Sequence, residues 1–144
     1  AELPESVLRK IDILTPNETE AQALTGVKIE GAADALRAAR AFGEKGVRRV
    51  VITLGAMGAF AADGERHELL PRIGVEAVDA TGAGDAFNGV FAMALAEGRD
   101  LFTALRYGNV AGALSVTRPG TAPAMPLRAE IDALYEATYG RLPR

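Results

Sequence analysis

The chain of 144 residues contains no cysteine, no tryptophan and a single histidine, His67. Without cysteine there can be no disulfide framework, no thiolate nucleophile and no cysteine-based zinc site, and one histidine cannot form a histidine cluster. We therefore expect no transition-metal chemistry. His67 is predicted to face solvent on a hairpin strand, without a functional role.

The chain also lacks an excess of charge of one sign and a long apolar run. Its net charge is -3, from 16 Lys and Arg against 19 Asp and Glu, with no basic block that could follow a nucleic-acid backbone. No apolar run reaches the roughly 18 residues that span a bilayer, and the N-terminal segment has no apolar signal-peptide core. These absences predict a cytoplasmic protein without nucleic-acid or membrane partners.

The composition that is present is typical of a folded domain, with 49% apolar and 24% charged residues. A chain of this length buries about 68–70% of the surface that it exposes when unfolded. We therefore expect one domain over residues 1–144.

Strand and helix patterns alternate along the chain. β-prone runs predict strands at 11–14, 49–54 and 75–78, and Asp63-Gly64 predicts a hairpin between 59–62 and 65–70. Apolar spacing with start and stop signals predicts helices at about 18–26, 32–44, 86–97, 101–115 and 127–140. This alternation predicts an α/β class protein, a three-layer α/β/α domain with a mainly parallel sheet and residues 49–54 as a central strand.

A glycine-rich segment, Thr81-Gly82-Ala83-Gly84-Asp85, precedes one of the predicted helices. Its small residues leave backbone N–H groups accessible at the positive end of the helix dipole, which suits an anion. Asp85 is then placed as a general base that takes a proton from a nucleophile while the N–H groups hold a phosphoryl group. The alternative is that the glycines permit tight packing and Asp85 is a helix N-cap. The segment is neither a P-loop, since no GK[ST] follows, nor a dinucleotide fingerprint, since Phe87 occupies the third glycine position.

Four motifs in order resemble those of the ribokinase-like (PfkB-type) carbohydrate kinases. Residues 79–89 (DATGAGDAFNG) resemble D-T-x-G-A-G-D-x-F-x-G, with Ala80 in place of the usual Thr. Residues 17–20 (NETE) resemble N-x-x-E, residues 53–58 (TLGAMG) resemble T-L-G-x-x-G, and residues 115–120 (SVTRPG) resemble S-V-T-R-x-G. The resemblance covers the C-terminal half of the family. It implies an incomplete ribokinase-like fold with a free sheet edge, through which copies of the chain could associate.

The resemblance also implies roles for individual residues. Asp85 corresponds to the base that accepts the proton of the sugar hydroxyl, and the anion hole corresponds to Gly82, Ala83 and Gly84. The residues that correspond to nucleotide contacts are Asn17, Thr53, Gly55, Gly58 and Asn109, and Glu20 corresponds to the magnesium shell. Structural alternatives are a helix cap for Asn17 and an acid favoured by the helix dipole for Glu20. For Thr53 and Gly55 the alternative is a strand end and turn, and for Asn109 it is a contact with a neighbouring loop.

A monovalent cation, potassium in the first place, is implied beside the anion hole. Its oxygen ligands, most of them backbone carbonyls, would come from Asp79, Thr81, Ser115, Arg118 and Gly120. A further hydroxyl of that site would fall at Ala124, which has none.

The resemblance predicts ATP-dependent phosphorylation of a sugar hydroxyl, with ATP and Mg²⁺ bound by this chain. The S-V-T-R-x-G match favours ribose, although most sugar-binding residues of the family lie outside the part that this chain resembles. The alternative is a truncated nucleotide-binding or assembly module that catalyses nothing.

Overall fold

The computed structural model describes residues 4–8, 10–75, 82–117 and 126–143, in two compact units. Unit 1 comprises residues 1–71 and unit 2 residues 72–144. A single domain over the whole chain stays a prediction. No helix within the described ranges is long and apolar enough to cross a membrane.

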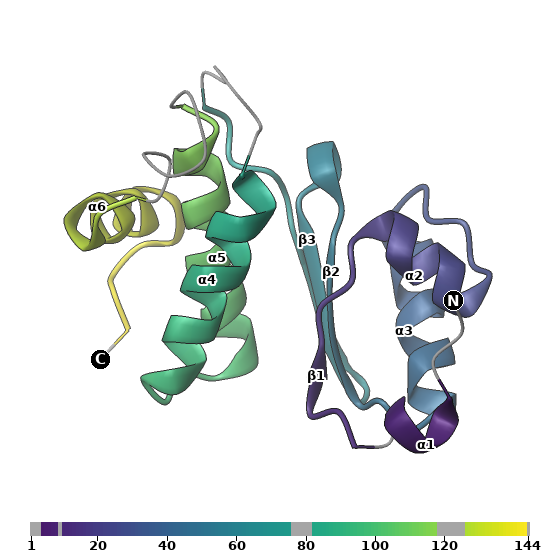
Figure 1. Cartoon of the computed structure of the whole chain (residues 1–144). Coiled ribbons are helices and arrows are strands. Elements are labelled where there is room, and N and C mark those ends of the chain that lie inside the picture. Colours follow the sequence, from purple (N-terminus) through teal and green to yellow (C-terminus); the bar gives the residue numbers. More distant parts are fainter. Residues whose placement is uncertain (1–3, 9, 76–81, 118–125, 144) are drawn as a thin grey trace. The chain divides into compact units, whose positions relative to one another are not determined.

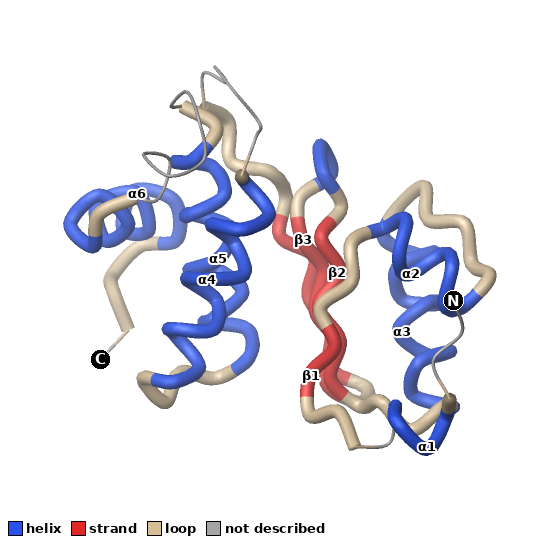
Figure 2. Tube along the Cα trace, in the orientation of Figure 1, coloured by secondary structure: helices blue, strands red, loops and turns tan. Residues whose placement is uncertain are grey.

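Unit 1 is a mixed sheet with helices packed on it. Its elements in chain order are α1 (Glu5–Leu8), β1 (Ile13–Leu14), α2 (Glu18–Thr25), α3 (Ala32–Glu44), β2 (Arg49–Thr53), the 3₁₀ turn η1 (Gly55–Met57), β3 (Ala59–Asp63) and β4 (Arg66–Leu70). The strand order is β1-β2-β3-β4. Figure 2 shows the strands in red and the helices in blue. The predicted α/β class is therefore confirmed. The described sheet is less parallel than expected, because only β1 and β2 run parallel and the hairpin after β2 adds two antiparallel pairs.

The core of unit 1 lies between the sheet and α2 and α3, which cover one of its faces (Figure 1). Helix α3 buries Ala35, Ala38, Ala39 and Phe42, the i, i+3, i+4, i+7 spacing of one helix face. Alternate strand residues meet this face, among them Val50, Ile52, Phe60 and Ala62. Burying each of the larger side chains contributes about 1.5–3 kcal/mol. The small alanines let α3 approach the sheet closely.

The hairpin of unit 1 forms where predicted, with its turn one residue later. Asp63 pairs with Arg66, so the two turn residues are Gly64 and Glu65. Gly64 has a φ of 61°, which side chains disfavour. His67 is exposed on β4, as predicted, and its ring stacks on Phe60 with centroids 6.0 Å apart.

Unit 2 consists of α4 (Ala83–Ala96), α5 (Leu101–Ser115) and α6 (Arg128–Tyr139). The bounds of α5 and α6 agree with the prediction, and the Asp100 carboxylate caps α5 by accepting from Thr103 N–H at 2.7 Å. Helix α4 differs, because it begins at Ala83 instead of residue 86. Of the strand predicted at 75–78, Val75 is not in a strand and 76–78 lie outside the described residues.

Candidate active site

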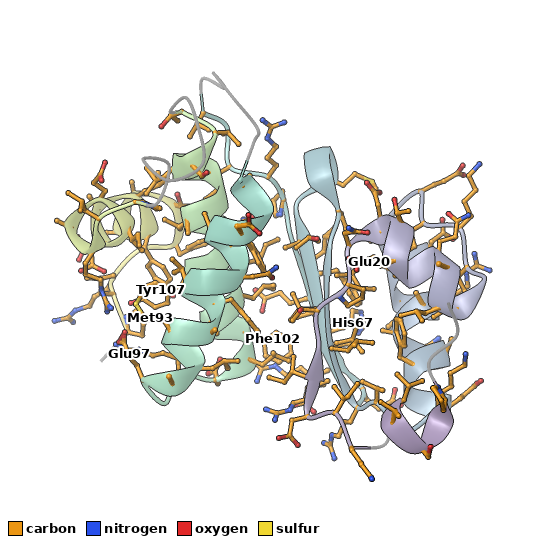
Figure 3. The ribbon with its side chains drawn as sticks, viewed as in Figure 1. Glu20, His67, Met93, Glu97, Phe102 and Tyr107 are labelled. Carbon is orange, nitrogen blue, oxygen red and sulfur yellow. The ribbon has the colours of Figure 1, made fainter. Side chains whose placement is uncertain are left out.

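The N-x-x-E motif of unit 1 forms the start of α2 through a reciprocal capping box. Asn17 Oδ1 accepts from Glu20 N–H at 2.8 Å, and Glu20 Oε1 accepts from Asn17 N–H at 3.0 Å. The helix-cap alternative therefore holds for Asn17. Glu20 lies in the first turn of α2, as its alternative expected, and its bond to the Asn17 N–H was not predicted. Both residues are exposed, with Glu20 labelled in Figure 3, and the box uses one oxygen of each side chain. The Glu20 Oε2 atom and the Asn17 amide nitrogen take no part in it.

The T-L-G-x-x-G motif lies directly beside this capping box. Thr53 N–H donates to Pro16 O at 3.1 Å, and Asn17 and Thr53 form an isolated parallel β-bridge. The two motifs meet because they follow the parallel strands β1 and β2, and the carboxyl ends of parallel strands lie at one edge of a sheet, where α/β proteins bind ligands. The structure thus brings the capping box of Asn17 and Glu20 next to Thr53, which is far from both in the sequence.

The turn after Thr53 is shaped by two glycines. Gly55 has a φ of 56° and Gly58 a φ of 102° with ψ of -135°. Leu54 N–H donates to Gly58 O at 2.9 Å, which closes the turn. A Cβ on Gly55 would lie 3.6 Å from Glu18 Oε1, so α2 and the turn are in contact. Glycine keeps the backbone of this turn accessible, as close approach of a nucleotide requires.

Sequence reasoning missed a hollow beside α2 in unit 1. Its volume is about 500 Å³, and its lining residues are Glu18, Thr19, Gln22, Ala23, Gly26, Lys28 and Ile29. It forms where the loop after α2 runs back along the helix, and no motif signals such a return.

The glycine-rich segment of unit 2 forms the N-terminus of α4. Gly82 is the N-cap, with a φ of 83°, and Ala83, Gly84 and Asp85 are the first three helical residues. The first N–H groups of a helix have no intrahelical partner, so the segment carries accessible donors at the positive end of the dipole. The N-cap alternative for Asp85 is therefore wrong, because Gly82 occupies that position. Asp85 is exposed, and no described residue hydrogen-bonds its carboxylate.

Two glycines of α5 hold the start of α4 in place. A Cβ on Gly108 would lie 3.1 Å from the Phe87 ring, and one on Gly112 would lie 3.6 Å from Ala83 O. These contacts bring the two helix backbones close together. The first turn of α4, including Asp85, is thereby fixed on the buried helix α5.

Asn109 lies on α5 with 8% of its surface exposed. Its Nδ2 donates to the Tyr139 hydroxyl of α6 at 2.9 Å. The side chain therefore has a structural contact, as the alternative proposed, but with a neighbouring helix instead of a loop. A nucleotide contact of Asn109 stays a prediction.

Of the residues predicted to hold a monovalent cation, the structure describes Ser115. Asp79, Thr81, Arg118 and Gly120 lie outside the described residues, as does Ala124. Ser115 is 0% exposed, and its Oγ has no hydrogen-bond partner in the described part of the chain. A buried hydroxyl without a partner costs stability, so this oxygen fits a cation ligand. No group of three or more Asp, Glu or His side chains that could hold a metal occurs among the described residues.

A cluster around the start of α6, which no motif predicted, joins the three helices of unit 2 (Figure 3). Arg128 donates to both carboxylate oxygens of Glu97 at the end of α4, at 2.7 and 3.4 Å, and to Asp132 at 3.3 Å. Its guanidinium carbon lies 5.7 Å from the centroid of the Tyr107 ring on α5. The Tyr107 ring packs on the Tyr135 ring, with centroids 4.6 Å apart. The hydrogen bond from Arg128 lowers the pKa of Glu97 below its usual value, and the same bond raises the pKa of Arg128.

Comparison with known proteins assigns the chain to a family. Residues 1–128 match the pfkB family of carbohydrate kinases. Ribokinase of Haemophilus influenzae is 44% identical over 128 residues, which are 89% of this chain and 42% of that protein. The chain thus spans less than half the length of this curated relative.

Solved structures agree with the sequence match. Arabidopsis thaliana ribokinase, complexed with ribose and ATP, has a TM-score of 0.87 at 36% identity, covering 94% of this chain and 44% of that one. Phosphofructokinase-2 from Escherichia coli, in complex with potassium, has a TM-score of 0.80 at 26% identity, covering 92% and 43%. The predicted ribokinase-like fold is therefore confirmed, and the chain belongs to the pfkB family of carbohydrate kinases.

Proposed function

We propose that this chain supplies the nucleotide site, the anion hole and the catalytic base of an ATP-dependent kinase that phosphorylates a sugar hydroxyl, with ribose as the favoured sugar. The observation that carries the proposal is Asp85. It is an exposed carboxylate without a described partner, on the same helical turn as accessible backbone N–H groups. Asp85 is not the N-cap of α4, and a carboxylate beside accessible N–H groups suits the acceptance of a proton next to a bound phosphoryl group.

The nucleotide binds in unit 1 at the paired motifs. Thr53 and the glycine turn at 55–58 contact it through backbone and hydroxyl groups, and Asn17 donates its amide N–H to a phosphate oxygen. Support comes from the β-bridge between Asn17 and Thr53 and from the positive φ of both glycines. The Arabidopsis relative was solved with ATP.

Phosphoryl transfer uses the start of α4. The N–H groups of Gly82, Ala83 and Gly84 hold the negative charge that develops on the transferring group, and Asp85 accepts the proton of the attacking hydroxyl. Mg²⁺ would be held by phosphate oxygens and, through water, by Glu20, since this ion keeps several waters and needs few protein ligands. It would neutralise phosphate charge. Potassium would be held at the end of α5 and at the predicted residues outside the described ranges.

The alternative, a module that binds nucleotide or assembles without catalysis, shares the same nucleotide site. Association of copies through the sheet edge is part of that alternative. The assembly form of this alternative gains support if the chain fails to bind nucleotide.

Thermal unfolding of the 144-residue chain with nucleotide tests the site. A ligand that binds only the folded state raises the free energy of unfolding by about 2.7 kcal/mol when its concentration is a hundredfold above Kd. We expect Mg-ATP and Mg-ADP to raise the Tm. Glu20→Gln keeps the capping box, since Gln also accepts from a backbone N–H, but removes the charge that attracts Mg²⁺.

We expect Glu20→Gln to reduce the extra stabilisation that Mg²⁺ adds to that of nucleotide alone. The matched control is Glu44→Gln, an exposed position at the end of α3, which should leave the response unchanged. Absence of any Tm shift at millimolar nucleotide would contradict the nucleotide site.

A further inference from the structure

The hollow beside α2 is a cavity of unit 1 that the proposed reaction does not use. Its volume is about 500 Å³, within the range of about 300–1,000 Å³ that small-molecule sites occupy. Its lining comes from α2 and from the loop that joins α2 to α3 (Figure 1). Space remains there because the helix contributes the small residues Ala23 and Gly26, and nothing lies within 4 Å of a Cβ placed on Gly26.

Bonds at the end of α2 hold the walls of the hollow in place. Gly26 is the C-cap, with a φ of 76°, and its N–H donates to Gln22 O at 2.7 Å. Lys45, which follows α3, donates from Nζ to Leu24 O at 3.0 Å and ties the ends of the two helices together. In the loop, Ile29 is 7% exposed and belongs to the core of unit 1. The hollow is therefore preformed, and a ligand would not have to order the loop.

The side chains that line the hollow carry one charge of each sign. Glu18 begins α2 and Lys28 lies in the loop. Lys28 Nζ lies 3.1 Å from Glu30 Oε1, but the two side chains are 74% and 69% exposed, and so open an ion pair contributes little. The ammonium group of Lys28 can therefore turn to a ligand at small cost. Thr19 and Gln22 add neutral donors and acceptors to the lining.

The C-terminal end of α2 adds a backbone acceptor. In a continued helix Ala23 O would accept from Val27 N–H, but this N–H donates to Thr25 Oγ1 at 3.2 Å. No other donor within the described ranges binds Ala23 O. The C-terminal end of a helix is also negative. Both Ala23 O and the Glu18 carboxylate thus favour an ammonium group of a ligand, whereas Lys28 favours a carboxylate.

We propose that this hollow binds a small zwitterion of the α-amino-acid class with an aliphatic side chain. The carboxylate of the ligand bonds Lys28, its ammonium group bonds Glu18 and Ala23 O, and its side chain lies against Ala23 and Ile29. A ligand with both charges is favoured because the charges of the lining cancel. A simple anion or cation would meet one side chain of its own sign.

Glu18 also connects the hollow with the glycine turn at 55–58. A Cβ on Gly55 would lie 3.6 Å from Glu18 Oε1, so this carboxylate contacts the turn as well as the hollow. A bound ammonium group would reduce the negative potential of Glu18 at the turn, which favours the phosphates of a nucleotide there. Occupancy of the hollow should therefore strengthen nucleotide binding about twofold to fivefold. This part of the inference rests on the proposed nucleotide site.

The test is a ¹H–¹⁵N NMR titration of the 144-residue chain with L-leucine, N-acetyl-L-leucine and L-leucinamide. The second compound lacks the ammonium group and the third lacks the carboxylate. We expect L-leucine at millimolar concentration to shift the amide signals of residues 18–29. Each analogue should bind at least about threefold more weakly, because one charged contact is lost.

Variants with matched controls make the result specific. Ala23→Leu fills the hollow from an exposed position of α2, and because leucine is a good helix former the variant should fold, as its Tm checks, and lose L-leucine binding. Ala33→Leu, at an exposed position of α3, should bind as wild type does. Lys28→Gln should weaken binding of L-leucine about threefold without weakening that of L-leucinamide. Lys10→Gln, at an exposed position of unit 1, should change neither.

The outcomes separate the parts of the inference. If L-leucine shifts no signals of residues 18–29, or if Ala23→Leu binds it as wild type does, the hollow is not a site for this ligand. Equal binding of either analogue would show that the assignment of a zwitterion is wrong. If L-leucine binds but leaves the Kd of Mg-ADP unchanged in calorimetry, the connection through Glu18 is wrong. Binding of L-leucine without any Tm shift by Mg-ADP would contradict the proposed nucleotide site and support the hollow as a site of its own.

Discussion

At the scale of single residues, the structure separates side chains with local partners from those without. Asn17 and Glu20 cap α2 through each other, and Asn109 binds Tyr139. Asp85 and the Ser115 hydroxyl have no such partner in the described ranges. A polar group without a hydrogen-bond partner in the fold is the better candidate for chemistry, although Asp85 is also favoured electrostatically in the first turn of α4.

The first prediction concerns Asp85, in a chimera in which residues 1–128 of this chain replace the matching segment of the Haemophilus influenzae ribokinase. Asp85→Asn should lower turnover with ribose by about 10²–10⁴, the range for a positioned base. In the 144-residue chain the same change should leave the Tm shift with Mg-ADP unchanged, because the proposed role of Asp85 is to accept the proton of the sugar hydroxyl and not to bind nucleotide.

Asp12→Asn is the control for this prediction. Asp12 is exposed in unit 1 and lies outside all four motifs. The chimera with Asp12→Asn should therefore have the turnover of the parent chimera. Turnover of Asp85→Asn within a few-fold of the parent chimera would remove Asp85 from the mechanism.

At the scale of elements, α4 depends on the glycines of α5. The Phe87 ring occupies the space that a side chain at Gly108 would need. Packing of this kind fixes where α4 begins, and so where the N–H groups of the anion hole lie. At the other end of α4, Arg128 contacts Glu97 through a hydrogen bond rather than through close packing.

The second prediction is that Gly108→Ala destabilises the chain although alanine favours helices. Its Cβ would lie 3.1 Å from Phe87, and overpacking costs about 1–3 kcal/mol. Gly43→Ala in α3 is the matched control, because nothing lies within 4 Å of its Cβ, and it should gain about 0.5–1 kcal/mol. Urea unfolding of both variants measures the difference, and equal free energies of unfolding would contradict the close contact.

The third prediction concerns the pH dependence of the Glu97 ion pair. Because Arg128 lowers the pKa of Glu97 below 4.5 in the folded state, the pair stabilises the fold above that pH. The contribution disappears as the pH falls through the lowered folded value. Glu97→Gln should therefore be less stable than wild type at about pH 7 and approach it at about pH 3 in low salt.

Denaturant unfolding at the two pH values measures this convergence. Glu136→Gln, at an exposed position of α6, serves as the control and should follow the pH dependence of wild type. A difference between wild type and Glu97→Gln that stays constant with pH would show that the ion pair is not its cause.

At the scale of the whole molecule, the predicted roles are divided between the two units. Asn17, Glu20 and Thr53 belong to unit 1, whereas Asp85 and Ser115 belong to unit 2. The chain covers 42% of its Haemophilus influenzae relative, and the resemblance puts most sugar-binding residues in the remainder. We therefore predict that nucleotide binding and sugar phosphorylation can be separated in this chain.

The fourth prediction is that the 144-residue chain binds Mg-ADP but phosphorylates ribose negligibly. Alignment of the attacking hydroxyl and exclusion of water supply much of the rate, and both need a sugar pocket. A coupled ADP-release assay with and without ribose measures this, with the active chimera as positive control. Ribose-dependent turnover near that of the chimera would show that the chain holds its own sugar pocket.

The sequence by itself determined the elements whose signals are local. Gly26 ends α2, Asp100 starts α5, and the bounds of α3 follow from its apolar spacing, because caps and periodicity act within one or two turns of the chain. The motif resemblance identified the family for the same reason, since each motif is a short run of residues.

Contacts between distant residues were decided only by the tertiary structure. Helix α4 begins at Ala83, where its backbone packs against Gly112. The sequence pattern predicted a start at residue 86, because glycines such as Gly82 and Gly84 usually end helices. The pairing of Asn17 with Thr53, the bond from Asn109 to Tyr139 and the bond from Arg128 to Glu97 join residues 30 to 36 positions apart. The unpaired state of Ser115 likewise depends on what surrounds it in space. Such contacts depend on which surfaces meet after folding, and no pattern along the chain records them.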